Sequence, residues 1–115
     1  MMKKLKPVLP TLREKKRYVV VQAVSLKKVM GGVEQAVMES IRALFGDLGV
    51  ANAGAFMVDT WDVNLQKGMF RVSHGFVDYF RAALAFVRSI HGAPVILRAV
   101  GVSGIMKKAK QQYLT

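Results

Sequence analysis

The chain has 115 residues, 52% of them hydrophobic, which suits one packed domain and leaves no room for two. It contains no Cys, which excludes disulfides, thiolate metal sites and Cys nucleophiles. The formal net charge is +11, and no uninterrupted apolar run approaches the ~20 residues of a membrane span, so we expect a cytoplasmic protein without a membrane anchor.

The first segment is basic and the second is apolar. Residues 1–16 combine Pro7 and Pro10 with many charges, a composition that predicts an extended basic arm. Residues 17–25, RYVVVQAVS, are rich in β-branched side chains and predict a strand. Both of its faces are apolar apart from Gln22, which is typical of a central strand covered on each side.

A helix and two further strands follow. Apolar side chains recur every three or four residues over 33–48, which predicts an amphipathic helix that ends at Gly49. Residues 55–62 and 67–73 predict a second and a third strand, joined by a hairpin-like turn.

The last third contains a second helix, a fourth strand and a terminal helix. Residues 75–90 carry an apolar stripe of helical spacing, and the Gly and Pro of 92–94 interrupt it. Residues 95–102 predict the fourth strand. Residues 103–115 predict a short basic helix of the same domain, with Ser103 as its N-cap.

The order strand, helix, strand, strand, helix, strand predicts an α/β fold of the α+β sandwich class. It is the ferredoxin-like split βαβ arrangement, which RNA-recognition motifs share, with one four-stranded antiparallel sheet over residues 17–102. Both helices should lie on one face of this sheet. The other face is then exposed, or covered by the terminal segments or by a partner. This architecture serves many functions, so the fold alone does not assign one.

The charges are unevenly distributed along the chain. Nine basic residues fall within residues 1–30 against one acid, whereas residues 31–78 hold six of the seven acids. After residue 78 there are six basic residues and no acid. Two basic ends favour binding to a polyanion such as nucleic acid, although Lys-rich ends can also serve solubility alone.

No catalytic set is evident in the sequence. His74 and His91 fall at element boundaries, and Asp59 and Asp62, three apart on a predicted strand, should point to opposite faces. We expect Asp59 to pair with Arg71 across the hairpin. Gly31-Gly32 is weak evidence for phosphate binding, and it leaves a ligand-sensing regulatory domain of the same fold as an alternative.

A second alternative is a free-standing RNA-recognition domain that stacks bases on its sheet. Its aromatic side chains would be Tyr18 on the first strand and Phe70 on the third. We expect Phe70 to be a core residue, so the basic termini are the better candidates for RNA contact.

Two terminal motifs carry a resemblance to a known family. The runs LPTLREKKRYVVVQ at 9–22 and ILRAVGVSGIMKKAKQQYL at 96–114 resemble archaeal ribonuclease P protein component 2, the counterpart of the eukaryotic Pop-five protein. LGVANAGAFMVD at 48–59 and the hairpin ending in GMFRVS at 68–73 fit the same family in order and spacing.

The resemblance implies a non-catalytic subunit of the ribonucleoprotein that removes 5′ leaders from precursor tRNA. The catalyst would be the ribonuclease P RNA with its Mg²⁺, and this chain would bind no cofactor. Its partners would be that RNA and the TIM-barrel-like component 3, two copies of each protein forming a heterotetramer, with only indirect contact to precursor tRNA. Exposed apolar side chains such as Met57 and Val100 would face component 3.

The residues expected to contact RNA are cations, together with the turn before the last helix. Arg71 and Arg98 are either paired with acids or turned to the RNA, and Ser103 and Gly104 either cap the helix or bind a phosphate. The full set is Arg13, Lys15, Lys16, Arg17, Arg71, Arg98, Ser103, Gly104, Lys107, Lys108 and Lys110.

Overall fold

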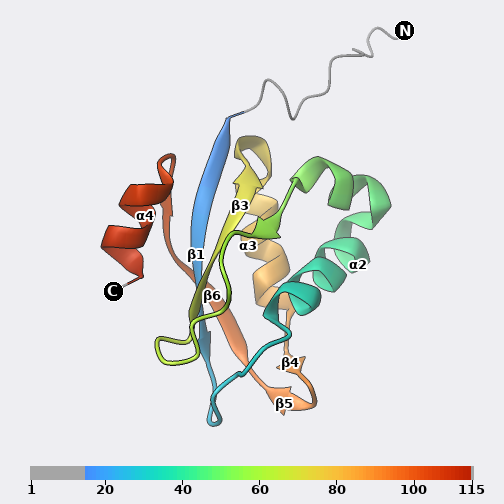
Figure 1. Ribbon diagram of the computed structural model, residues 1–115. Helices are drawn as coiled ribbons and strands as arrows, with labels where there is room; N and C mark the ends of the chain where they lie inside the picture. The colour runs from blue at the N-terminus through green and yellow to red at the C-terminus, as the bar shows by residue number, and fades with distance from the viewer. Residues whose placement is uncertain (1–14, 115) are drawn as a thin grey trace, which may run out of the picture.

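One antiparallel sheet organises the chain, with its four strands in the order β2-β3-β1-β6 (Figure 1). The computed structural model describes residues 15–114. The central strand β1 (Lys16–Val24) pairs with β3 (Lys67–Ser73) on one side and with β6 (Ile96–Ser103) on the other. The short β2 (Phe56–Met57) pairs with the outer side of β3. This is the strand order of the split βαβ arrangement, so the predicted fold class is confirmed.

Two helices cover one face of the sheet. They are α2 (Val33–Ala53) and α3 (Val77–Phe86), the latter preceded by the 3-10 turn η1 (His74–Phe76). Alternate residues of β1 and β3 point into this layer, as the two-residue period of a strand requires. Val19, Val21 and Phe70 are therefore fully buried, and the ring of Phe70 lies 5.3 Å from that of Phe80. The prediction that Phe70 belongs to the core is confirmed.

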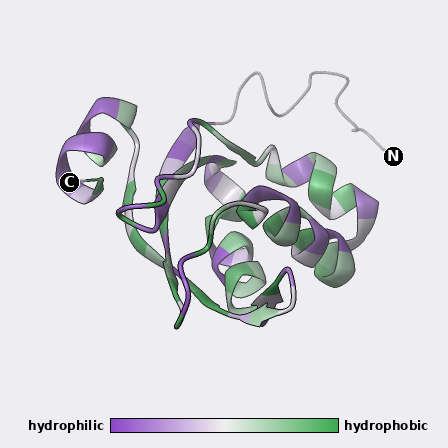
Figure 2. Ribbon diagram, turned by 60° about the horizontal axis from the view of Figure 1, so that its bottom comes forward, coloured by the Kyte–Doolittle hydropathy of each residue, from purple (hydrophilic) through white to green (hydrophobic). Residues whose placement is uncertain are grey.

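The C-terminal helix α4 (Met106–Tyr113) covers the middle of the opposite face (Figure 1). Val20 and Met69 of the sheet are fully buried against Ala109 of this helix. Figure 2 shows α4 mostly in the hydrophilic colour, because only a narrow stripe of it meets the sheet. The prediction that a terminal segment covers this face is confirmed.

Two apolar residues predicted to be exposed to a partner instead pack against other side chains of the same chain. Met57 is partly buried against the core beneath α2 and α3. Val100 is partly buried in the cluster beneath α4. Their prediction as exposed positions is wrong, because Met57 pairs with Phe70 and packs on the core of the helix layer, whereas Val100 packs beneath the terminal helix.

The first helix runs further than its pattern predicts. Gly49 does not end it but lies buried inside it, and the helix continues to Ala53. The break comes earlier, at Gly46, whose φ of 74° kinks the helix, and the end comes at Gly54, with φ 52°. Gly54 is in the left-handed helical region and Gly46 in the extended region at positive φ, and glycine adopts both without strain.

The second helix is shorter than predicted. It ends at Phe86, and the chain then forms a small hairpin of β4 (Ser89–Ile90) and β5 (Ala93–Pro94). Val87 and Ile90 are nevertheless buried in the core. They continue the helical spacing of apolar residues although they lie in extended chain. For this reason the apolar pattern predicted a longer helix than the one present.

The predicted second strand is also reduced to two residues. Beyond β2, the chain leaves β3 and rejoins it only at a single bridge between Asp62 and Lys67, which closes the predicted turn. Trp61 anchors the segment that leaves β3, because its Nε1 donates a hydrogen bond to the carbonyl of Val29 at 2.9 Å.

Candidate nucleic-acid interface

The two basic ends of the chain meet at one end of the sheet. The start of β1 runs antiparallel to the end of β6, and Tyr18 pairs with Ser103 in this register. The guanidinium of Arg17 lies over the following turn, 3.2 Å from the position that a Cβ on Gly104 would occupy. The structure therefore brings Arg17 next to the β6–α4 turn. Lys15 is exposed just before β1, whereas the side chain of Lys16 turns away to β3, where its Nζ lies 3.3 Å from Oγ of Ser73. Arg13, predicted for the same group, lies outside the described residues.

Ser103 does not cap α4. The helix begins at Met106, and its N-cap is Ile105, which has no side-chain cap bond. The Oγ of Ser103 instead accepts a hydrogen bond from the backbone N–H of Ile105 at 3.1 Å and lies 3.1 Å from that residue's carbonyl oxygen. The predicted N-cap is therefore wrong by two residues, because Ser103 is still the last residue of β6 and closes the turn that leads into the helix.

The three lysines of α4 differ in their surroundings. Lys107 and Lys108 are exposed and form no ion pair with any residue between 15 and 114. The Nζ of Lys110 lies 3.0 Å from Oδ2 of Asp59, and both side chains are about half exposed. Such a pair contributes at most about 1 kcal/mol, yet it offsets one of the three charges. The predicted pairing of Asp59 with Arg71 is therefore wrong.

Arg71 stacks on an aromatic ring. Its Cζ lies 5.4 Å from the ring centroid of Phe56, its cross-strand neighbour in β2. Its Nε is buried, with no hydrogen-bond acceptor among residues 15–114. Of the two alternatives for this side chain, pairing with an acid is excluded within the described part of the chain.

Arg98 lies apart from the other cations. It donates two hydrogen bonds, from Nε at 3.1 Å and Nη2 at 2.9 Å, to Oε1 of Gln22, its neighbour on β1. Gln22 is four residues along β1 from Tyr18, or about 13 Å at the rise of a strand. The structure therefore does not bring Arg98 to the end of the sheet where the basic termini meet.

The arrangement needed for an RNA-recognition motif is not present. Tyr18 pairs with Arg71 and Val19 with Phe70, so Tyr18 and Phe70 point to opposite faces of the sheet. Tyr18 is partly buried in the cluster beneath α4. The two aromatic residues cannot form one stacking surface.

The described residues gather no metal cluster, and the Gly31-Gly32 loop is closed at Gly32 but open at Gly31, where a hollow of about 200 Å³ lies. Between residues 15 and 114, no three His, Asp or Glu side chains come together as possible metal ligands. Gly32 has a left-handed backbone with φ 83°, and the ring of His91 fills the space beside its Cα. No helix in this range is long and apolar enough to cross a membrane.

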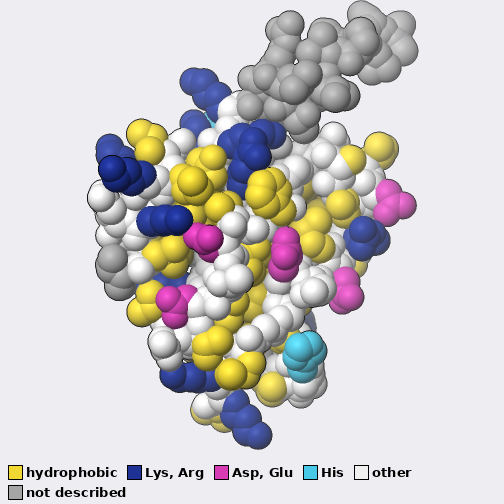
Figure 3. All heavy atoms as spheres, viewed as in Figure 1, with side chains coloured by type: hydrophobic (Ala, Val, Ile, Leu, Met, Phe, Trp, Pro, Cys, Tyr) yellow, Lys and Arg dark blue, Asp and Glu magenta, His cyan; other side chains and the backbone are white. Residues whose placement is uncertain are grey.

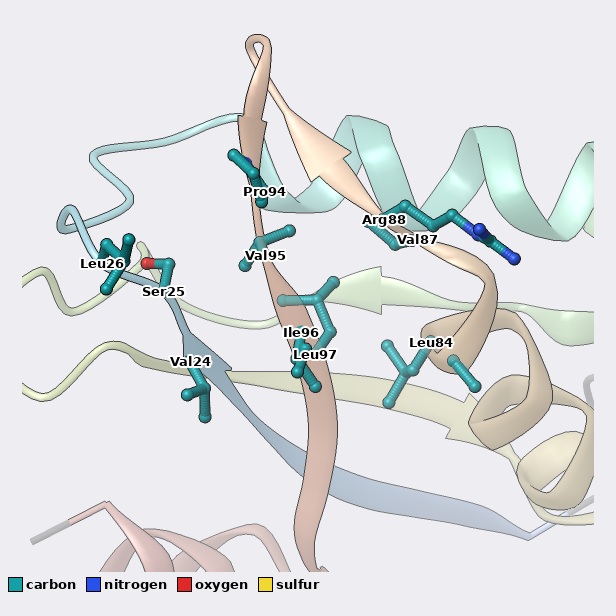
Figure 4. Close-up of a pocket in the computed structure, with 11 residues that line it drawn as sticks. Val24, Ser25, Leu26, Leu84, Val87, Arg88, Pro94, Val95, Ile96 and Leu97 are labelled. Carbon is teal, nitrogen blue, oxygen red and sulfur yellow. The ribbon is translucent and has the colours of Figure 1, made fainter.

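Lys and Arg side chains gather over α4 and the upper end of the sheet in the view of Figure 3. A hollow of about 640 Å³ lies elsewhere, where β1 ends and β6 begins (Figure 4). Its side chains are apolar except for Ser25 and Arg88, and it involves none of the predicted site residues that the structure describes. The candidate interface is therefore the cationic end of the sheet and not this hollow.

Two residues that position parts of the candidate interface were not identified from the sequence pattern. Phe56 supports Arg71, and the hairpin register between the second and third strands was the signal that could have revealed it. Lys67 donates from Nζ to the carbonyl of Tyr113 at 2.9 Å and so ties the end of α4 to the sheet. No local signal relates these two residues, which are far apart in the sequence.

Comparisons with known proteins give one answer. Residues 17–114 match the model of the Rpp14/Pop5 family. Ribonuclease P protein component 2 of Pyrococcus horikoshii is 33% identical over 99% of this chain and 95% of its own length. The protein of the same name from Thermococcus gammatolerans is 36% identical with the same coverage. A chain in the cryo-EM structure of yeast ribonuclease MRP has a similar fold, with a TM-score of 0.60 at 15% identity over 79% of this chain and 75% of that one.

Proposed function

The chain belongs to the Rpp14/Pop5 family, and we propose that it is a protein subunit of ribonuclease P, which supports the catalytic RNA in removing the 5′ leader from precursor tRNA. The observation that carries this proposal is sequence identity of 33% and 36%, over 99% of this chain, to two proteins named ribonuclease P protein component 2. The meeting of two basic segments at one end of the sheet supports it independently, because neutralised phosphates supply much of the affinity for nucleic acid.

The proposed role of the chain is electrostatic and structural. We assign the Mg²⁺ of the reaction to the RNA component. The cations at the end of the sheet would lower the repulsion between RNA segments that must approach one another. Contact with precursor tRNA would be indirect, through the RNA that the chain supports.

We further propose a protein partner of the component 3 type, with two copies of each chain in the assembly. Large apolar side chains that remain exposed on the described surface support a protein contact. Leu48 is 78% exposed and Phe86 62%, and neither lies on the cationic end of the sheet. The location we propose is the cytoplasm, where a cell without a nucleus matures its tRNA.

A reconstitution tests the function. Precursor tRNA is incubated with the cognate ribonuclease P RNA at a Mg²⁺ concentration at which the RNA alone is barely active. The chain is then added with a component 3-type subunit, with that subunit alone as the control. We expect faster 5′ cleavage only when this chain is present, and no cleavage by RNA-free chain. An equal rate with and without the chain, or cleavage by RNA-free chain, would contradict the proposal.

A further inference from the structure

A second hollow lies at the outer edge of the sheet, between α2 and the strands β2 and β3. It has a volume of about 480 Å³. Met38 and Val50 of α2 give it an apolar floor, and Lys16, Phe56 and Arg71 contribute its remaining large side chains. Cations and an aromatic ring thus border one apolar space.

The two cations approach this space from different strands. In the antiparallel register Lys16 pairs with Ser73 and Tyr18 pairs with Arg71. Lys16 and Arg71 are therefore diagonal neighbours on the same face of the sheet, with their Cα atoms about 7 Å apart. The Nζ of Lys16 donates to Oγ of Ser73 at 3.3 Å. Neither cation forms an ion pair with a residue in the described range 15–114. The hollow therefore presents two positive charges that no carboxylate of this range offsets.

Arg71 is unusually placed for a structural residue. Its guanidinium is stacked on Phe56, and its buried Nε has no acceptor within residues 15–114. A buried donor without an acceptor is costly, so this one calls for a partner that the described residues do not supply, such as an ordered water or a ligand. The guanidinium lies over the ring in a cation–π contact, and its forked N–H groups are of the kind that binds a planar or tetrahedral oxyanion.

The backbone around the hollow allows close approach. Gly54 ends α2 with φ 52°, and a Cβ there would lie 3.0 Å from Oγ of Ser73 and 3.7 Å from Nζ of Lys16. A side chain at position 54 would crowd the Ser73 hydroxyl and contact the Lys16 ammonium. Gly54 therefore lets Lys16 and Ser73 pack closely against the backbone at this edge of the hollow.

We propose that this hollow binds one unpaired nucleotide of an RNA chain, with a phosphate held by Arg71 and Lys16 and the base stacked against Phe56. The inference rests on the proposed function and deepens it by naming the kind of RNA segment recognised. Two uncompensated cations select a phosphate, and the ring, which is 42% exposed, offers an aromatic surface. A base in a duplex is stacked between its neighbours, so only a loop, bulge or single strand can supply one.

Binding of a labelled single-stranded RNA of about ten nucleotides, followed by fluorescence anisotropy, tests the site. Phe56→Leu should weaken binding by about 5- to 150-fold, the range of base–aromatic stacking, and leave the salt dependence unchanged. Lys16→Ala should instead reduce the slope of log affinity against log salt by about 0.7. Arg71→Lys keeps the charge but loses the fork, so it should weaken binding at an unchanged slope.

Matched controls lie elsewhere in the chain. Phe86→Leu alters a phenylalanine that is 62% exposed and outside the hollow, and Arg42→Lys alters an exposed helix arginine whose Nε lies 3.2 Å from Oδ1 of Asp47. Both should bind within about twofold of the unaltered chain. The unaltered chain and the Phe56→Leu variant should have the same affinity for a duplex of the same length, because a duplex offers no unstacked base. Adenosine monophosphate should compete only weakly, whereas micromolar competition that depends on Phe56 would make this a free-nucleotide site and overturn the proposal.

Photocrosslinking of the unaltered chain gives a result that does not depend on variant folding. RNA containing 5-bromouridine should crosslink to the peptide that holds Phe56, and crosslinks confined to α4 would overturn the site.

Failure of the proposed site and failure of the proposed function give different results. If Phe56→Leu binds normally while the chain still stimulates the catalytic RNA, the site is wrong and the function stands. If the chain gives no stimulation although Phe56→Leu loses single-strand binding, the site stands and the function is wrong.

Discussion

Gly101 lies in β6 directly beneath the ring of Tyr113, the last residue of α4. A Cβ at Gly101 would come closer than 3.0 Å to three ring atoms of Tyr113. Carbon atoms in ordinary contact are about 3.5–4.0 Å apart. Gly101→Ala therefore forces the ring, and with it the end of α4, away from the sheet.

The expected cost follows from what holds α4. Overpacking costs about 1–3 kcal/mol where neighbours cannot move. Here the ring is only partly buried, and besides the small apolar cluster the helix is held by the bond from Lys67 and the exposed pair between Lys110 and Asp59. The ring can therefore move in part, and we expect Gly101→Ala to lower the free energy of unfolding by about 1–2 kcal/mol.

Urea denaturation followed by circular dichroism measures this cost. In a Tyr113→Ala background the clash is absent, so adding Gly101→Ala should cost less than about 0.5 kcal/mol, which gives a coupling of about 1–2 kcal/mol between the two positions. Gly31→Ala is the control, because nothing lies within 4 Å of a Cβ there. An equal cost of Gly101→Ala in both backgrounds would show that α4 does not rest on β6 as described.

Three further changes have defined outcomes. Phe70→Ala should lower the free energy of unfolding by about 3–5 kcal/mol in the same assay, because the side chain is fully buried; a cost below about 1 kcal/mol would contradict this. Replacing Lys107 and Lys108 with Ala should flatten the salt dependence of RNA binding between about 50 and 200 mM salt, by up to ~0.9 for each phosphate that is no longer neutralised. Lys110→Ala should flatten it less, since its ion pair already offsets the charge; the reverse order would refute this. Trp61→Phe removes one hydrogen bond to a backbone carbonyl and should cost about 0.5–1.5 kcal/mol by thermal or urea unfolding; an unchanged stability would show that the bond contributes nothing.

The parts of the fold that follow from local periodicity could be predicted from the sequence. The alternation in β1, and the apolar stripes of both long helices, specify which side chains meet, so the class, the strand order and the burial of Phe70 follow. Element ends could not be predicted as well. Gly46, Gly49 and Gly54 all lie near the end of one helix, and only the packing of Ala53 on the core decides that the last of them terminates it.

The candidate site was predictable in composition but not in pairing. The basic segments at both ends of the chain are visible as charge, and antiparallel pairing of the first and last strands brings them together. The partner of Asp59 was not predictable, because Lys110 reaches it only once α4 is laid across the sheet. Arg71 was placed correctly on its strand, yet its stacking on Phe56 depends on a short edge strand whose length the pattern overestimated.

The position of β1 also determines when the protein can fold during its synthesis. Of the strands between residues 15 and 114, the first to leave the ribosome is the central one, and one of its two edges pairs with β6, about 80 residues later in the chain. Until β6 emerges, the apolar run Val19-Val20-Val21 keeps an unpaired edge of the kind that pairs with other chains. Pairing over such a separation is slow, because a long loop must close before any contact compensates for it. Nascent chains that stop before residue 96 should therefore be the species most prone to aggregate.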